Sequence, residues 1–197
     1  MRAMVLLCAA VFTAAGCSGE RVVNTGEWAN IPTPSTSVTP SLPPTSVEHL
    51  ADASEFAAHP DGRPEAGYYF TTPSGRWQCA IVPRVWAGCQ NRGGSLGIAD
   101  APRTVPDADG TPTAPNAIVI GPDGDAYFTV LEQPGFTLVP GPAKKLDYNQ
   151  TLIAARFRCN VQEATGVSCL SEQSGRGFTF SADGYSLQYA EVPLDAP

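Results

Sequence analysis

Short runs of apolar and aromatic residues follow one another from about Gly67 to the C terminus, separated by turns rich in glycine and proline. Runs of this length and spacing are typical of antiparallel strands rather than of helices. The pattern predicts a mainly β fold, a small antiparallel β-sandwich or barrel over 67–197. About 130 residues are enough for one core that buries roughly two thirds of its surface. The strands are expected over Tyr68–Thr72, Trp77–Val82, Trp86–Gln90, Ala117–Ile120, Ala126–Leu131, Leu152–Asn160, Gly166–Leu170, Gly177–Phe180 and Ser186–Ala190.

A helix-start pattern precedes the β region. Thr45 and Glu48 have the spacing of a capping box, in which a hydroxyl residue is followed three positions later by Glu. A weakly apolar helical face continues to about Ala58, and His59-Pro60 then ends it because proline disfavours helix at the residue before it. We expect a short N-terminal helix in a connecting region over 47–66, packed on the edge of the β domain.

The segment 17–46 is a predicted tether. From Ile31 to Ser46 it contains five prolines and eight Ser or Thr residues. Such a composition cannot build a core and favours extended, solvated conformations. Thirty residues at about 3.1 Å each span at most roughly 90 Å, which is enough to hold a domain away from a surface.

The first sixteen residues have the organisation of an export signal. Arg2 precedes an apolar run from Ala3 to Ala15, which is shorter than the roughly 20 residues that a membrane-spanning helix needs. Small residues lead directly into Cys17, and this junction resembles a bacterial lipobox. The resemblance implies a lipid, such as palmitate, on Cys17 and a location on the outer, extracytoplasmic face of the cell membrane. The alternative is an ordinary secretory signal followed by a chance cysteine.

The charge balance excludes one class of partner. The formal net charge is −7, and the chain has only two lysines, Lys144 and Lys145. Nucleic acid calls for clustered basic residues. We therefore expect no nucleic-acid partner, and an acidic surface that serves solubility.

Four cysteines beyond Cys17 form two pairs with the same spacing, nine residues between partners. An even number in an exported chain is typical of disulfides, and zinc sites favour much shorter spacings. Each pair can face its partner across a hairpin with a three-residue loop, centred on Arg84 and on Ala164. This favours Cys79–Cys89 and Cys159–Cys169 over the two cross-hairpin connectivities. A reactive thiol is the remaining alternative.

The cysteine framework, with the motifs Phe70-Thr-Thr-Pro-Ser-Gly75 and Ser174-Gly-Arg-Gly-Phe178, resembles a family of uncharacterised exported domains of actinobacteria, often found in mycobacterial lipoproteins. The resemblance covers Tyr68 to Tyr189. Where the family commonly has Asn after Pro-Ser-Gly and His in Gly-His-Gly-Phe, this chain has Arg76 and Arg176. The resemblance implies a fold and a location, and no activity.

Two other motifs resemble functional sites but are better interpreted as a loop and a turn. Gly93-Gly-Ser95-Leu-Gly97 matches a hydrolase nucleophile elbow, but both histidines precede it and no strand–helix alternation surrounds it, which favours a glycine-rich loop. Asp107-Ala-Asp109-Gly110 lacks the spacing of a calcium loop and is typical of a tight turn. We expect no catalytic residue, no metal site and no cofactor.

Consecutive aromatic residues supply the only positive sign of a binding surface. Tyr68, Tyr69 and Phe70 are adjacent, so one of them should face away from the core if they share a strand. An exposed aromatic beside an arginine is suited to binding, which makes Tyr68, Tyr69, Arg76 and Arg84 the candidate face.

Three functions are therefore in competition. The first is a non-catalytic binding domain for an envelope protein, glycan or lipid. The second is a cell-envelope hydrolase that uses Ser95 or a pair of carboxylates. The third is a carrier of an apolar ligand, which requires an aliphatic cavity of at least about 300 Å³.

Overall fold

The computed structural model describes residues 45–61, 66–91, 94–131 and 135–197, and all of them belong to one compact unit, Val38–Pro197. The predicted signal segment, Cys17 and nearly all of the tether lie outside the described residues.

The first sheet has seven strands, in the order β1-β2-β3-β4-β7-β8, with β9 paired to β2. All of its pairings are antiparallel except that of β9, which runs parallel to β2. The bounds are β1 Ala57–Ala58, β2 Gly67–Thr71, β3 Trp77–Val82, β4 Trp86–Asn91, β7 Ala117–Ile120, β8 Tyr127–Thr129 and β9 Lys144–Lys145.

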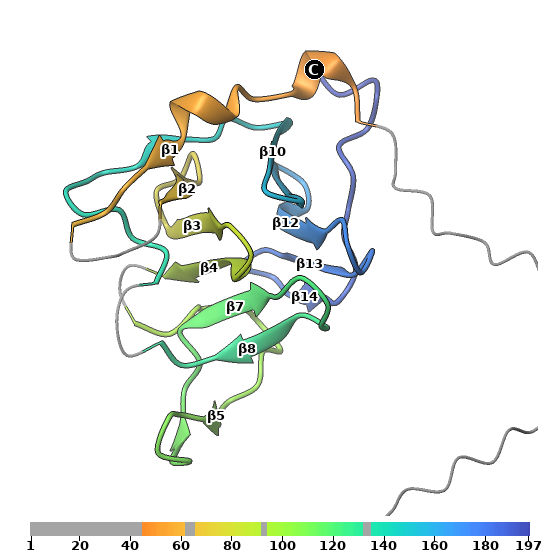
Figure 1. Cartoon of the computed structure of the whole chain (residues 1–197). Coiled ribbons are helices and arrows are strands. Elements are labelled where there is room, and N and C mark those ends of the chain that lie inside the picture. The colour runs from red at the N-terminus through yellow and green to blue at the C-terminus, as the bar shows by residue number, and fades with distance from the viewer. Residues whose placement is uncertain (1–44, 62–65, 92–93, 132–134) are drawn as a thin grey trace, which may run out of the picture. The chain divides into compact units, whose positions relative to one another are not determined.

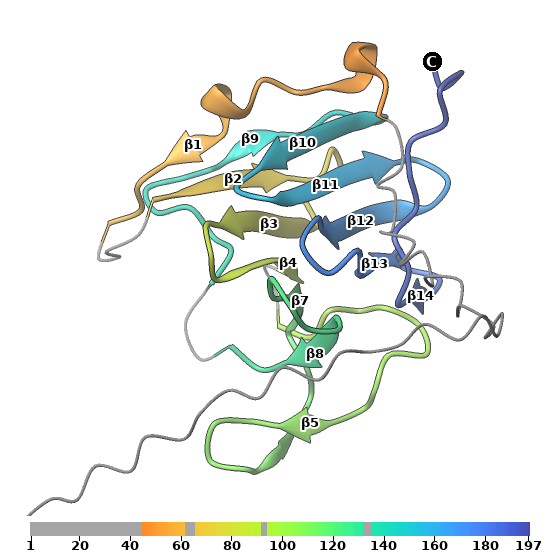
Figure 2. The same cartoon turned by 45° about the vertical axis from the view of Figure 1, so that its right-hand side comes forward.

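The second sheet is an antiparallel meander of five strands in sequence order (Figures 1 and 2). Its strands are β10 Gln150–Ala154, β11 Phe157–Gln162, β12 Gly166–Ser171, β13 Gly177–Phe180 and β14 Tyr185–Ser186. A separate two-stranded hairpin is formed by β5 Val105–Pro106 and β6 Pro112–Thr113.

The two sheets form a sandwich around one core. β12 packs against β4 and β7, and apolar side chains of both sheets belong to a single buried cluster. That cluster includes Phe70, Ile81 and Ile118 from the first sheet and Leu152 and Phe178 from the second. The predicted mainly β, antiparallel architecture is therefore confirmed.

Both predicted disulfides are present at the centre of this core. Cys79 and Cys89 are direct partners in the β3–β4 ladder, and Cys159 and Cys169 are direct partners in the β11–β12 ladder. The Cα atoms of each pair are 4.1 Å apart, and all four residues are fully buried. The intervening loops have three residues each, as the spacing predicts.

A smaller core covers the opposite face of the first sheet. Tyr69, Ala80, Val119 and Phe136 pack there with parts of the 135–143 segment. A Cβ atom on Gly88 of β4 would lie 2.5 Å from the carbonyl oxygen of Ile118 and 2.7 Å from the Phe136 ring. Gly88 therefore permits the close approach of this segment to the sheet.

The predicted N-terminal helix differs from expectation. It is two 3₁₀ turns, η1 Val47–His49 and η2 Ala53–Glu55, rather than one continuous helix. Between them Leu50 pairs with Thr151 of β10, and the N–H of Ala51 donates to the carbonyl of Thr151 at 3.0 Å. Because these backbone groups pair with the edge strand β10, they cannot also form the hydrogen bonds of a continuous helix.

Two predicted strands were also wrong. The run expected as one strand over Leu152–Asn160 is two strands, β10 and β11, joined by a turn at Ala155-Arg156. The run expected over Ser186–Ala190 leaves the sheet after β14.

In the described part of the chain, no helix has the length and apolar character needed to span a bilayer.

Candidate functional site

The four residues of the predicted binding face do not form one surface. Tyr69 is only 1% exposed and packs in the smaller core, while Tyr68 is partly buried against the main core. Arg76 precedes β3 and Arg84 follows it. A six-residue strand is roughly 20 Å long, so the two arginines lie at opposite ends of the sandwich.

Arg76 has a structural role at its end. Its Nη2 donates to the carbonyl of Gly97 at 2.7 Å, and its guanidinium carbon lies 4.8 Å from the centre of the Trp77 ring. These contacts attach the loop around Ser95 to the start of β3. The Arg76 guanidinium is thus engaged by groups of the chain itself.

Arg84 lies at a cleft that the sequence pattern did not predict. The cleft has a volume of about 240 Å³ and is formed where four turns meet, those after β3, β7, β10 and β12. We call it the two-arginine cleft. Its lining residues are Arg84, Pro122, Ala155, Arg156, Phe157, Ser171 and Gln173.

Two of these turns place non-glycine residues in the left-handed region. The β10–β11 turn has φ of 48° at Ala155 and 66° at Arg156, the signs of a type I′ turn, which normally uses Asn-Gly. In the β3–β4 turn Arg84 follows Pro83 with φ of 64°, a position that in a type II turn favours glycine.

The strain is concentrated at the cleft. Five non-glycine residues have positive φ in the described chain, and three of them line this one cleft. Left-handed backbone costs such residues about 1–2 kcal/mol each. Strained backbone of this kind clusters at binding and catalytic sites, where a particular side chain is needed despite its cost.

Neither arginine of the cleft is neutralised within the fold. Arg84 and Arg156 are both exposed, and neither guanidinium makes an ion pair or hydrogen bond with another described residue. The neighbouring carboxylates have other partners. Asp123 accepts from the Gln173 amide, Asp125 pairs with Arg176, and Glu172 pairs with Arg158. The cleft therefore presents two guanidinium groups without an ion-pair partner among the described residues, and the Asp123 carboxylate beside it is bonded to the neutral amide of Gln173.

The wall of the cleft is joined across the two sheets. The Ser171 hydroxyl at the end of β12 donates to the carbonyl of Pro122 in the β7–β8 turn, at 2.6 Å. Phe157, the first residue of β11, is 1% exposed and belongs to the main core. The cleft thus has a fixed base at Phe157, with accessible apolar surface from Pro122 and Ala155.

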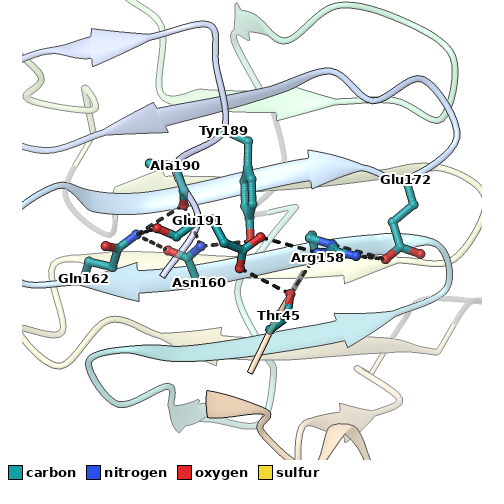
Figure 3. Close-up of polar contacts among 8 residues, drawn as sticks. All are labelled: Thr45, Arg158, Asn160, Gln162, Glu172, Tyr189, Ala190 and Glu191. Carbon is teal, nitrogen blue, oxygen red and sulfur yellow. Dashed lines mark hydrogen bonds and ion pairs between the residues drawn. The ribbon is translucent and has the colours of Figure 1, made fainter. Parts of the chain in front are cut away.

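A polar cluster occupies the outer face of the second sheet (Figure 3). Arg158, Asn160 and Gln162 alternate along β11 and are all buried. Asn160 and Gln162 donate to the carbonyl of Ala190, at 2.8 and 3.2 Å, and so hold the C-terminal segment over the sheet.

Arg158 closes this cluster at its other end. Its guanidinium pairs with Glu172 at 2.8 Å and Glu191 at 3.4 Å, and donates to the Thr45 hydroxyl at 2.9 Å. Burial, together with the Glu191 charge, raises the pKa of Tyr189 well above its usual range, so this phenol stays protonated. Arg158, Asn160 and Gln162 donate to other residues of the chain, which indicates that the cluster attaches the C-terminal segment to the sheet rather than binding a ligand.

A groove of about 300 Å³ lies at the opposite end of the sandwich. Arg76 and an exposed aromatic residue both line this groove, which is the combination that the binding-face hypothesis requires. The aromatic residue is Tyr148, which is 44% exposed, and not Tyr68 or Tyr69. The acidic residues Glu163 and Asp183 also line it.

The surroundings of Ser95 do not favour hydrolysis. Ser95 opens on a surface cavity of about 240 Å³ whose described lining contains Arg103 but no His, Asp or Glu to act as a base. His49 is a buried residue of η1 and is not part of that lining.

The described residues also contain no cluster of three or more His, Cys, Asp or Glu side chains placed to hold a metal ion. Asp107 instead stabilises the β5–β6 turn. Its carboxylate accepts from the N–H of Thr111 and the hydroxyl of Thr113, at 2.8 and 3.0 Å, and these bonds lower its pKa.

Sequence reasoning identified Arg84 but missed Arg156, because no turn residue marks Ala155-Arg156. A comparison with protein-family models, curated proteins and solved structures finds no match to this chain, so the assignment of this site depends on its own geometry.

Proposed function

We propose that this chain is a membrane-anchored, non-catalytic binding domain of the cell envelope, and that its ligand occupies the two-arginine cleft. One observation carries the proposal: three non-glycine residues with left-handed backbone converge on one cleft that contains two unpaired cations. Folding alone would be better served by glycine at these positions, because glycine adopts positive φ without steric cost.

A binding role suits the chemistry of the cleft better than catalysis. Its one hydroxyl, that of Ser171, donates to a backbone carbonyl, and no lining residue is a His, Asp or Glu. Nucleophilic catalysis needs a nucleophile with a base in hydrogen-bond reach. The cleft has groups that attract and orient a ligand, and lacks such a pair among its described lining.

The carrier hypothesis receives less support. The residues of the inter-sheet core are at most 8% exposed, and the cavities described above each include exposed residues in their lining. An apolar carrier would instead enclose its ligand between the sheets.

The anchor is part of the proposal and rests on the lipobox-like junction at Cys17 and the tether behind it. Lipid chains give durable attachment because each buried methylene contributes about 0.8 kcal/mol. In the producing cell, the wild-type chain should incorporate labelled palmitate and sediment with membranes, whereas Cys17→Ser should do neither. A wild-type chain without fatty acid would remove the anchor from the proposal.

Occupancy of the cleft can be tested in intact cells with a photo-crosslinking amino acid at Gln173, an exposed lining residue. The same probe at Thr111, an exposed residue of the β5–β6 hairpin, is the matched control. We expect a discrete adduct of defined mass at 173 and none at 111. Identical labelling patterns at both positions would contradict the proposed function.

A further inference from the structure

We infer that the ligand of the two-arginine cleft carries a phosphate monoester, held between the guanidinium groups of Arg84 and Arg156. This inference rests on the proposed function and names the chemical class of its ligand. It follows from the charge, placement and backbone conformation of the two arginines.

The two cations approach the cleft from different sheets. Arg84 is carried by the β3–β4 turn of the first sheet and Arg156 by the β10–β11 turn of the second. A group between them can therefore receive hydrogen bonds from two directions. A guanidinium presents a planar fork of donors that matches the oxygens of phosphate or carboxylate.

The charge of the cleft selects between these oxyanions. Two guanidinium groups supply two positive charges, and no described lining residue is acidic. A phosphate monoester carries a charge of about −1.5 to −2 at neutral pH and has three strong acceptor oxygens, whereas a carboxylate carries −1. The monoester therefore neutralises both cations, and a single carboxylate leaves one of them unpaired.

The rest of the cleft limits what is attached to the phosphate. Pro122 and Ala155 offer apolar surface, and Gln173, whose amide donates to Asp123, also lies on the lining. The volume of about 240 Å³ is below the roughly 300–1,000 Å³ of sites that enclose a drug-sized ligand. It accommodates a phosphate and a short carbon group, which describes both a small soluble ester and the headgroup of phosphatidic acid.

The unusual backbone supplies a test, because substitution by glycine should weaken binding without lowering the stability of the domain. Arg84→Gly and Arg156→Gly each remove a cation and relieve a left-handed conformation. The full chain, purified in neutral detergent, is titrated calorimetrically with glycerol 3-phosphate, and its melting temperature is measured in parallel. Arg103→Gln, at an exposed arginine outside the cleft, is the matched control.

We expect glycerol 3-phosphate to bind the wild type and the Arg103 variant alike. Each glycine variant should bind about tenfold or more weakly, as loss of a charged hydrogen bond requires. Its melting temperature should be unchanged or higher. Unchanged affinity in the Arg84→Gly/Arg156→Gly double variant would overturn the inference, and so would equal affinity for glycerate, the carboxylate of matching size.

A second arm distinguishes the two sources of phosphate. Full chain with Cys17→Ser, which lacks the anchor, is mixed with phosphatidylcholine vesicles with or without phosphatidic acid. Arginine-dependent binding to the phosphatidic acid vesicles alone identifies a lipid headgroup, and binding of glycerol 3-phosphate alone identifies a soluble ester. If neither binds, the inference is wrong, and a specific adduct at position 173 would still leave the proposed function standing.

Discussion

Single residues of the two-arginine cleft are held in conformations that their side chains disfavour. Ala155 has φ of 48° and is exposed, so it gains no burial that would offset the strain. Its methyl group instead contributes apolar surface to the cleft. At this scale the molecule gives up stability at the residues where a ligand would bind.

Ala155→Gly should therefore stabilise the domain by about 1 kcal/mol, because glycine adopts positive φ without the steric cost of Cβ. Urea unfolding measures the change. Ala164→Gly is the control, since Ala164 is also an exposed turn residue but is not among those with positive φ. That control should be neutral or destabilising, and a stabilisation of equal size there would contradict the argument.

Thr151 in β10 carries a polar group that the fold leaves unsatisfied. Its hydroxyl oxygen is buried and has no hydrogen-bond partner in the described chain. Thr151→Val removes this unpaired group at nearly constant shape and should stabilise the domain by about 1 kcal/mol.

Thr179→Val provides the opposite case. The Thr179 hydroxyl donates to the carbonyl of Gln188 at 2.7 Å and accepts from the N–H of Ala190 at 3.1 Å. This substitution also leaves the buried Ser168 hydroxyl without its partner at 2.8 Å, so it should destabilise by about 2 kcal/mol. Thermal unfolding of both variants tests the pair, and stabilisation by both substitutions would be inconsistent with it.

At the scale of elements, the C-terminal segment after β14 is held by side chains rather than by strand pairing. Asn160, Gln162 and Thr179 bond to its backbone, and Arg158 bonds to the Glu191 side chain. The same arginine contacts Thr45, so the first described residue and the C-terminal segment meet at one side chain (Figure 3). Arg158 thereby connects elements that are distant in sequence.

Arg158→Met should cost about 3 kcal/mol. This is the lower end of the range for breaking a buried pair, because Glu172 and Glu191 remain about one fifth exposed and can be hydrated. Arg176→Met breaks the ion pair with Asp125, whose two side chains are 55% and 74% exposed, and should cost less than about 1 kcal/mol. Chemical denaturation compares the two, and equal losses would refute the role given to Arg158.

The β5–β6 hairpin should lose order in acid. Hydrogen bonds from Thr111 and Thr113 lower the pKa of Asp107 below its ordinary value of 3.8, so the folded hairpin favours the ionised carboxylate. This contribution is complete above the unfolded pKa and is lost as pH falls below about 4, through the folded pKa. The protection of the Thr111 amide, its exchange rate compared with that of the unfolded chain at the same pH, should therefore fall at low pH, and Asp107→Asn should remove that dependence.

At the scale of the whole molecule, the two disulfides lie inside the sandwich rather than on its surface. All four cysteines are fully buried and share the core with aromatic residues of both sheets. The cross-links and the hydrophobic core therefore protect each other, since a reductant reaches the sulfurs only when the sheets separate.

We accordingly expect both disulfides to resist reductant under native conditions and to be reduced together as urea unfolds the domain. Thiol alkylation followed by mass spectrometry measures the number of free cysteines at each urea concentration. Reduction of one pair in the folded domain would show that the hairpins open independently.

Several features could be predicted from local patterns alone. The strands around the cysteines follow from short apolar runs, and the disulfide pairing follows from nine-residue spacing across a three-residue loop. The turn at Ala155-Arg156 could not be predicted, because neither residue favours positive φ. The C-terminal run was wrongly predicted as strand, since side chains of β11 and β13 bond its backbone where a strand partner would.

By itself the sequence determined the β class, the hairpins and their disulfides, because these depend on residues within about ten positions of each other. Only the tertiary structure decided that Tyr69 is buried, that Arg76 is used within the fold, and that Arg84 and Arg156 share one cleft. These outcomes depend on which segments cover a sheet face, which loops pack at a strand end and which turns meet at the end of the sandwich. Contacts between residues 21 or more positions apart leave no periodic signal in the chain.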